Sequence, residues 1–205
     1  MTESIENKIF NSIKHRRNGT IIFASDFSRL GNAQAINKAL ERLTNAQKIL
    51  RLSKGIYCKP LIETELGLGV IYPSLEEIAE AIAKRDRSRI MPAGDFALNQ
   101  LGLSTQVPLN AVYITDGTSR RIKIYNGRGI LFQRVAPKRF AFKNRFCAML
   151  TSALQIIGKG NLSEEQNIRI KEHLTKIPKE SIEHDIQLMP EWIRTIIRNN
   201  YAELS

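Results

Sequence analysis

Within the first sixty residues, apolar positions recur twice at helical spacing. One stripe consists of Ile5, Ile9 and Ile13, and the other of Ile36, Leu40 and Leu43. Residues three or four apart lie on one face of an α-helix, so both stretches are predicted to be amphipathic helices. Asn18-Gly19 ends the first helix, and Asn32 caps the second. Between them, the N-cap pair Ser25-Asp26 predicts a short helix over residues 27–30, stopped by Gly31.

The same region contains short runs that are typical of β-strands. Residues 20–23 are β-prone, and residues 49–52 and 56–59 flank the tight turn Ser53-Lys54-Gly55, which predicts an antiparallel hairpin ended by Pro60. The predicted order is helix, short strand, helix, helix and basic hairpin. This is the element order of a winged helix-turn-helix, so residues 1–60 are predicted to form such a DNA-binding domain.

Beyond Pro60 the signals change. Residues 61–73 are predicted to be a connector, because the next clear signal is the capping box Ser74-x-x-Glu77 at the start of a helix that ends near Arg85. A short helix over residues 95–101 is expected to be followed by strands over 111–115, 121–125 and 130–135, with turns at Asp116-Gly117 and Asn126-Gly127. Helical patterns follow from Phe142, with a capping box at Ser163-x-x-Gln166, Pro178 as a breaker, and an apolar stripe of Trp192, Ile193, Ile196 and Ile197.

These signals together predict an α+β protein. Its N-terminal winged helix-turn-helix, residues 1–60, is followed by the connector at 61–73 and by a small α+β domain with a helical C-terminal tail, residues 74–205. At 205 residues, 42% of them hydrophobic and 25% charged, the chain has the length and composition of one or two ordinary globular domains.

The positive charge is unevenly distributed along the chain. The formal net charge is +11. Residues 1–60 contribute +7, from 11 Lys/Arg and 4 Asp/Glu; residues 61–160 contribute +6, from 14 and 8; residues 161–205 contribute −2, from 6 and 8. A polyanion such as nucleic acid is therefore expected to contact the first two-thirds of the chain.

Several classes of protein do not fit this composition. The first residues carry acids in place of the basic segment of a signal peptide, and apolar stretches such as 66–72 and 149–157 fall short of the ~20 residues of a membrane span. We therefore expect a cytoplasmic protein without membrane contact. Cys58 and Cys147 are too few for a disulfide framework or a zinc site, which predicts two buried free thiols.

The second amphipathic helix offers side chains that read base edges. Those predicted to face outward are Gln34, Asn37, Lys38, Glu41 and Arg42. Asn and Gln both donate and accept hydrogen bonds, and the N-terminal members of a recognition helix reach the bases best, which favours Gln34, Asn37 and Lys38. The alternative is a merely solvated polar face.

The surrounding residues favour DNA over that alternative, because they can contact phosphates on either side of the groove. The phosphate-contacting candidates are Arg16, Arg17, Ser25, Arg29, Lys48, Arg51, Ser53 and Lys54. If ~6 phosphates are neutralised, the logarithm of affinity falls against the logarithm of salt concentration with a slope of about −5.

Three short motifs in this region keep a common spacing: Ser25-Asp26-Phe27-x-x-Leu30-Gly31, Ala39-Leu40-x-Arg42-Leu43 and Arg51-Leu52-x-Lys54-Gly55-Ile56-Tyr57. Over about residues 20–60 the chain resembles the AbiEi-type antitoxins, winged-helix regulators of type IV toxin-antitoxin and abortive-infection operons. The resemblance implies that the protein binds double-stranded DNA at its own promoter and that its C-terminal part opposes a nucleotidyltransferase-like toxin encoded next to it.

The chain departs from that family at one position. Relatives usually carry Gly where this chain has Gln47, so the left-handed residue that ends the recognition helix is expected to be missing.

A second basic segment lies between Arg120 and Arg145, with nine Lys/Arg, no acidic residue and several interleaved aromatics. The candidates for a second surface are Arg120, Arg121, Lys123, Arg128, Arg134, Lys138 and Arg139. One interpretation is a nucleic-acid surface, and RNA or an acidic toxin fits equally well. The other is that the aromatics face the core of a sheet whose outer side is basic.

Catalysis is the weakest interpretation. Asp95, Asp116 and Lys123 come nearest to a nuclease set, but carboxylates are sparse, and no nucleophile motif or Gly-rich phosphate loop is present. The histidines His15, His173 and His184 lack partners at metal-ligand spacing. We therefore expect no enzyme, cofactor or metal. A metal-dependent nuclease and a general nucleic-acid scaffold stay as alternatives, and the operator and the oligomeric state are open.

Overall fold

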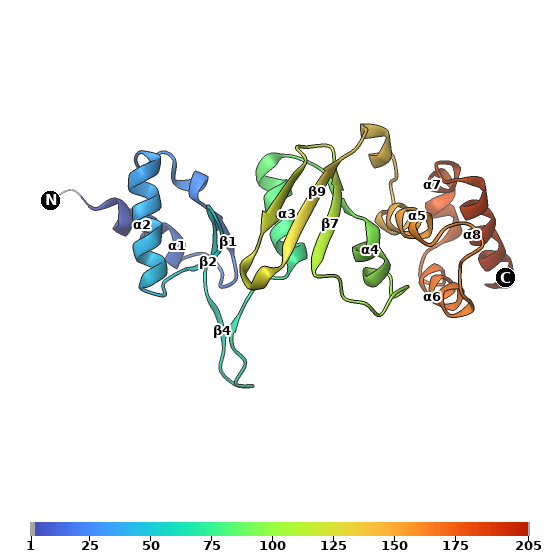
Figure 1. The fold of residues 1–205 in the computed structure, drawn as a ribbon, viewed down its shortest axis with the longest axis horizontal. Coiled ribbons are helices and arrows are strands. Elements are labelled where there is room, and N and C mark those ends of the chain that lie inside the picture. The colour runs from blue at the N-terminus through green and yellow to red at the C-terminus, as the bar shows by residue number, and fades with distance from the viewer. Residues whose placement is uncertain (1–2, 205) are drawn as a thin grey trace. The chain divides into compact units, whose positions relative to one another are not determined.

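The computed structural model describes residues 3–204 and shows an α+β protein, which confirms the fold class expected from the sequence (Figure 1). The chain divides into two compact units. Unit 1 comprises the residues up to Ile82 together with Ile122–Arg128, and unit 2 comprises Ala83–Arg121 and the residues from Gly129 onward. Each unit is described by itself below.

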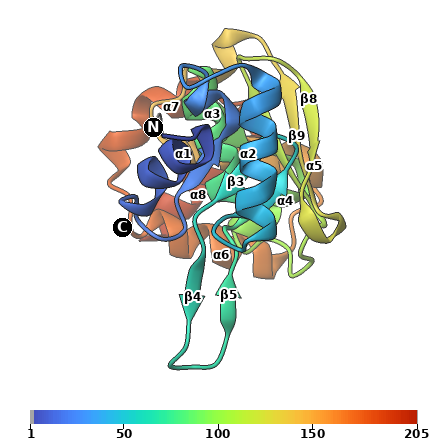
Figure 2. The same ribbon diagram turned by 90° about the vertical axis from the view of Figure 1, so that its left-hand side faces the viewer.

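Unit 1 has the predicted sequence of elements. They are α1 (Ile5–Lys14), β1 (Ile21–Phe23), a 3-10 helix η1 (Ala24–Phe27), α2 (Ala33–Asn45), β2 (Leu50–Ser53) and β3 (Ile56–Cys58). The strands form an antiparallel sheet of order β1-β3-β2, which lies beside the upright α2 in Figure 2. Asn32 caps α2 as predicted, since its side-chain oxygen accepts the Ala35 N–H at 2.8 Å.

The short second helix differs from its prediction over residues 27–30. It is the 3-10 helix η1 and lies earlier, with Ser25 and Asp26 inside it. The cause is that Asp26 reaches backward: its carboxylate accepts the Phe23 N–H at 3.1 Å. Gly31 then serves close packing, because a Cβ there would lie 2.7 Å from the Ile5 side chain.

The core of unit 1 joins the apolar faces of the two helices to the sheet. Its buried members are Ile9, Ile13, Ile22, Phe27, Ile36, Ala39, Leu40, Leu43, Ile49 and Tyr57. Each buried large apolar side chain contributes ~1.5–3 kcal/mol relative to exposure, so burying one stripe orients the opposite, polar face of α2 outward.

Gln47 overturns the expectation that α2 lacks a left-handed terminating residue. Its φ is +56°, and the backbone around it forms a Schellman ending. The Lys48 N–H donates to the Leu43 carbonyl and the Gln47 N–H to the Thr44 carbonyl, both at 2.9 Å. Gln47 therefore adopts the left-handed conformation that Gly usually supplies at the end of a helix.

The segment expected to be a connector contains a hairpin. The strands β4 (Leu61–Glu63) and β5 (Gly69–Ile71) pair antiparallel as a separate two-stranded sheet, and both views show this hairpin extending away from the rest of unit 1 (Figures 1 and 2). The helix α3 (Leu75–Asp86) follows, and its predicted capping box is confirmed: the Glu77 N–H donates to the Ser74 hydroxyl, and the Ser74 N–H donates to the Glu77 carboxylate.

The sheet of unit 2 has the order β6-β7-β9-β8. Its strands are β6 (Ile90–Pro92), β7 (Asn110–Thr115), β8 (Arg120–Lys123) and β9 (Gly129–Arg134), with α4 (Gly94–Gln100) between β6 and β7. The end of β8 and the 3-10 helix η2 (Tyr125–Gly127) before β9 belong to unit 1. The three central strands were expected to follow one another through turns. Instead β9 lies between β7 and β8 and pairs parallel with β7 along its whole length. Strand β6 was missing from the prediction.

The helical tail is confirmed. It consists of the 3-10 helix η3 (Pro137–Phe140), α5 (Arg145–Ile157), α6 (Glu164–Leu174), the 3-10 helix η4 (Lys179–Ile182), α7 (Glu183–Gln187) and α8 (Glu191–Leu204). The Ser163-Gln166 capping box is present, with both of its hydrogen bonds. Ile193 and Ile197 of the predicted stripe are buried in the core of unit 2, and Trp192 and Ile196 pack against it, half-buried.

Candidate nucleic-acid interface

The outward face of α2 carries all five predicted base-reading side chains. Gln34, Asn37, Lys38, Glu41 and Arg42 are exposed, whereas the apolar stripe of the same helix is buried. The first four lie at positions i, i+3, i+4 and i+7, which is a single face of a helix. Helical spacing thus predicted which way these side chains point.

A cleft joins this face to the β2-β3 hairpin. It has a volume of about 580 Å³ and is lined by Asn37, Glu41, Arg51, Lys54, Gly55 and Tyr57. Gly55, at φ +73°, makes the tight turn that places Lys54 at the hairpin tip. Arg51 and Lys54 are exposed, so the structure brings two predicted phosphate-contacting residues together with two predicted base-reading residues.

A second cleft also borders Asn37 and is lined by residues of η1 and of the start of α2. It measures about 350 Å³ and is lined by Ala24, Ser25, Ser28, Gly31, Ala33, Ile36 and Asn37. Asn37 borders both clefts and therefore occupies the middle of the candidate interface. Ser28 and Tyr57 were missed as lining residues. A hydroxyl beside the Ser25-Asp26 pair was a signal for Ser28, whereas Tyr57 follows the pattern of a buried strand residue.

Three of the cations predicted to contact DNA instead contact other side chains of unit 1. The Arg42 Nε donates to Glu6 Oε2 at 2.5 Å, linking α2 to α1. Arg16 contacts Asp26 at 3.5 Å, and the Lys48 ammonium lies 4.4 Å from the centre of the Phe10 ring. Arg42 and Arg16 are thus partly neutralised. Four other members of the predicted phosphate-contacting set are exposed: Arg17, Arg29, Arg51 and Lys54.

Ser53 is tied to another part of unit 1. Its hydroxyl donates to the Lys123 carbonyl oxygen at 2.7 Å. The bond fixes one end of the hairpin turn but still leaves the hydroxyl oxygen able to accept. The predicted phosphate contact of Ser53 stays a prediction.

The predicted second basic surface is divided between the units. Lys123 and Arg128 belong to unit 1, and the remaining five candidates to unit 2. Arg120 pairs with Asp86 and lies over the Phe132 ring, so part of its charge is offset. Arg121, Arg134, Lys138 and Arg139 are exposed.

The aromatics of that segment are largely unavailable for stacking on bases. Phe132 is buried, and Phe140, Phe142 and Phe146 pack against the core of unit 2. Tyr125 is half-buried and stacks on Tyr72, with ring centres 4.1 Å apart. These contacts favour the interpretation in which the aromatics belong to the core and the basic side chains to the surface.

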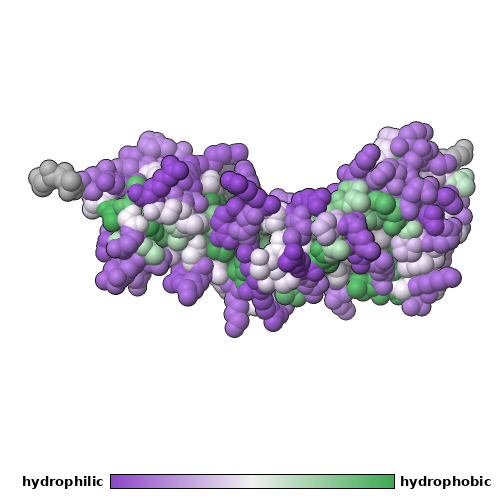
Figure 3. Space-filling model, turned by 90° about the horizontal axis from the view of Figure 1, so that it is seen from above, coloured by the Kyte–Doolittle hydropathy of each residue, from purple (hydrophilic) through white to green (hydrophobic). Residues whose placement is uncertain are grey.

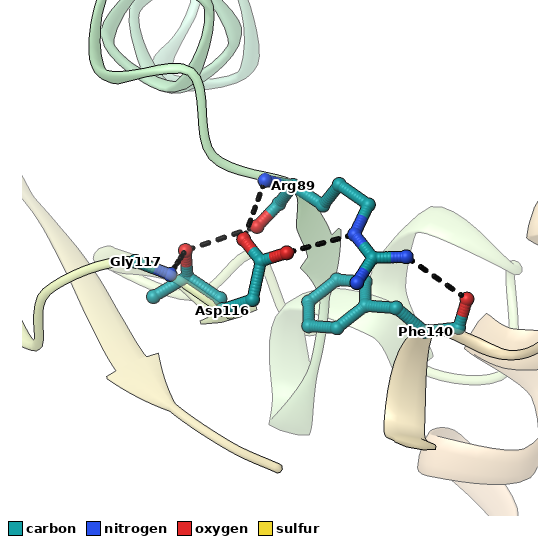
Figure 4. Close-up of polar contacts among 5 residues, drawn as sticks. Arg89, Asp116, Gly117 and Phe140 are labelled. Atoms are coloured by element: carbon teal, nitrogen blue, oxygen red, sulfur yellow. Dashed lines mark hydrogen bonds and ion pairs between the residues drawn. The ribbon is translucent and has the colours of Figure 1, made fainter. Parts of the chain in front are cut away.

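Asp116, the central carboxylate of the nuclease hypothesis, is bound by Arg89 (Figure 4). The Arg89 N–H and Nε each donate to one of its oxygens at 2.7 Å, and the guanidinium lies over the Phe140 ring. The hydrogen bond from the Arg89 side chain holds the pKa of Asp116 below its ordinary value. Lys123 lies in the other unit, and Asp95 is exposed on α4.

The two cysteines are buried free thiols, as the sequence analysis predicted. Burial raises the pKa of the Cys58 thiol to about 11 and that of the Cys147 thiol to about 12.

Over residues 3–204, no three His, Cys, Asp or Glu side chains come together as metal ligands. No helix in the same range combines the length and hydropathy needed to cross a bilayer. Hydrophilic side chains cover much of the visible face of each unit (Figure 3).

Comparison with known proteins yields a family and a fold. The family described as "Family of unknown function (DUF6088)" matches residues 8–182. The crystal structure of the RV2827C protein from Mycobacterium tuberculosis is similar, with a TM-score of 0.53 and 13% sequence identity over 98% of this chain and 78% of the other. No curated protein matches. At this identity the structural similarity establishes a shared fold only.

Proposed function

Because the chain belongs to the DUF6088 family, whose description assigns no function, we propose from its own residues that it is a sequence-specific DNA-binding protein. In this proposal α2 enters the major groove and the β2-β3 hairpin contacts the flanking backbone as a wing. One observation carries the proposal: base-reading residues of α2 and cations of the hairpin line a single cleft.

The dimensions and chemistry of α2 suit the groove. A helix of 13 residues is ~20 Å long, and a major groove of ~12 Å width admits one helix. Gln34 and Asn37 offer the bidentate pattern that recognises adenine, and Lys38 that of a guanine contact. Glu41 can accept from cytosine, and Arg51 and Lys54 in the same cleft offset its repulsion of phosphates.

The wider role rests on the resemblance over residues 20–60. We propose that the protein represses its own promoter and is the antitoxin of a nucleotidyltransferase-like toxin, with unit 2 opposing the toxin. A test of the second part is growth of cells that carry the neighbouring toxin gene. The full chain is expected to restore growth, and failure to restore it would remove the antitoxin role while leaving DNA binding intact.

DNA binding itself is tested by fluorescence anisotropy with the promoter duplex and a scrambled duplex across a salt series. Asn37→Ala and Gln34→Ala should each lose ~1–3 kcal/mol on the promoter, a loss of about 5-fold to 150-fold in affinity, with little change on scrambled DNA. Lys54→Ala should weaken both duplexes alike and lower the salt slope by about one.

Lys176→Ala is the matched control, because it removes one exposed positive charge from the tail of unit 2. It should leave both affinities and the salt slope unchanged. Equal affinity of the wild-type protein for both duplexes would overturn sequence specificity and favour a general nucleic-acid scaffold. Metal-dependent cleavage of either duplex would favour the nuclease alternative.

A further inference from the structure

The β4-β5 hairpin concentrates the exposed apolar surface of the protein. Of the eleven large apolar side chains that are exposed among the described residues, six lie in residues 61–72, which we call the arm. They are Leu61, Ile62, Leu66, Leu68, Val70 and Tyr72. Such a concentration of exposed large apolar side chains marks an interaction site. An isolated two-stranded hairpin is also marginally stable in water, so a partner would stabilise it.

The loop at the tip of the arm is held by hydrogen bonds to a side chain of the arm itself. The Glu63 carboxylate accepts hydrogen bonds from the N–H groups of Glu65 and Leu66, at 2.7 and 2.8 Å, and from that of Leu68 at 3.5 Å. Gly67 and Gly69 both have φ near +70°, which completes the loop. The loop holds Leu66 and Leu68 in solvent, where they are 78% and 63% exposed. Folding of unit 1 gains nothing from displaying these two leucines.

The charge of the arm restricts its partner. No Lys or Arg occurs between Lys59 and Lys84, in a chain whose net charge is +11, and the arm itself carries Glu63 and Glu65. An acidic, apolar tip does not suit DNA. It suits an apolar cleft with a positively charged side chain at its edge.

Unit 2 contains an apolar cleft whose lining includes one lysine and one glutamate. The cleft has a volume of about 550 Å³, lies beside the start of α8 and is lined by Lys159, Gly160, Leu162, Glu191, Trp192, Thr195 and Ile196. We call it the Trp192 cleft. Leu162, Trp192 and Ile196 are half-buried apolar side chains, and Lys159 is exposed at the cleft. Glu191 pairs with Arg194 and Arg198, which offsets its negative charge.

We infer that this protein self-associates by seating Leu66 and Leu68 of one copy in the Trp192 cleft of a second copy. Glu65 of the arm then lies near Lys159 of the cleft. The arm and the cleft are complementary in hydropathy and charge, and each copy carries both. Reciprocal exchange between two copies fills both clefts with two-fold symmetry, the commonest symmetry of soluble oligomers.

Sedimentation velocity of the full chain between 1 and 100 μM, without DNA, tests the inference independently of the proposed DNA binding. The wild type should associate over this range, and the double variant Leu66→Asp, Leu68→Asp should bind itself at least 100-fold more weakly. Leu109→Asp is the matched control: Leu109 is 61% exposed in unit 2, outside both the arm and the cleft lining, and this variant should associate like the wild type. A wild type that is monomeric throughout, or a double variant that associates normally, overturns the inference.

Trp192 gives a second measurement, because it is the single Trp of the chain. Its emission should shift to shorter wavelength as the wild-type concentration rises, and the shift should be absent in the double variant. Lys159→Glu should weaken association about 10-fold, and adding Glu65→Lys should restore it. If the arm variant alters Trp192 emission without any dependence on concentration, the arm is seated in its own copy and the inference is wrong. Far-ultraviolet circular dichroism confirms that each variant is folded.

Discussion

Replacing Gln47 by Gly should stabilise unit 1, because Gln47 has a left-handed backbone. At φ +56° a residue with a Cβ is strained by ~1 kcal/mol or more relative to right-handed conformations, and Gly removes that strain. Gly also has more freedom in the unfolded chain, which takes back ~0.5 kcal/mol. The expected net gain in the free energy of unfolding is about 0.5–1 kcal/mol, which corresponds to a rise in Tm of about 2–6 °C for a unit of this size.

Urea unfolding of the full chain, followed by circular dichroism, measures the gain. Ala46→Gly is the control: Ala46 is exposed next to Gln47 but has φ −79°, so Gly relieves no strain there and should lower the free energy of unfolding by ~0.5–1 kcal/mol. Gln47→Ala keeps the strain and should resemble the wild type. A Gln47→Gly protein no more stable than the wild type would refute this prediction, because Gly would then relieve no strain at φ +56°.

Three further predictions concern unit 2 and the thiols. Asp185 is fully buried and accepts two backbone N–H groups at the start of α5, so Asp185→Ala should lower the free energy of unfolding by about 2–4 kcal/mol in the same urea assay. Arg89 lowers the pKa of Asp116, so this pair stabilises the fold above the unfolded pKa near ~3.9 and the contribution is lost as the pH falls through the lower folded value. Asp116→Asn should therefore flatten the loss of stability in acid, by less than ~1 kcal/mol because the pair is partly exposed. Burial raises the pKa values of Cys58 and Cys147, so neither thiol should react with Ellman's reagent at pH 8 until the protein is denatured.

Local signals predicted the helices of this fold. The Ser74 and Ser163 capping boxes and the Asn32 cap lie within three residues of their partners, so sequence spacing alone identifies them. Apolar spacing likewise predicted the outward face of α2, because a helix that buries one stripe must expose the other.

Features that depend on contacts between residues far apart in the sequence could not be predicted in this way. The position of β9 between β7 and β8 depends on pairing across the sheet, not on the turn after β7. The ion pair of Arg42 joins residues 36 positions apart, so its engagement with Glu6 was invisible in the sequence. The β4-β5 hairpin has no two-residue turn motif that a sequence pattern could identify. Its loop is stabilised instead by hydrogen bonds from backbone N–H groups to the Glu63 side chain.

Amide chemical-shift mapping of the full chain with its promoter duplex tests the central claim most directly, because it compares both candidate surfaces in one experiment. We expect the largest changes at Gln34, Asn37, Lys38 and the hairpin residues Arg51 and Lys54, with small changes in unit 2. Changes confined to the basic segment of unit 2, at Arg134, Lys138 and Arg139, would contradict it and assign nucleic-acid contact to the other surface.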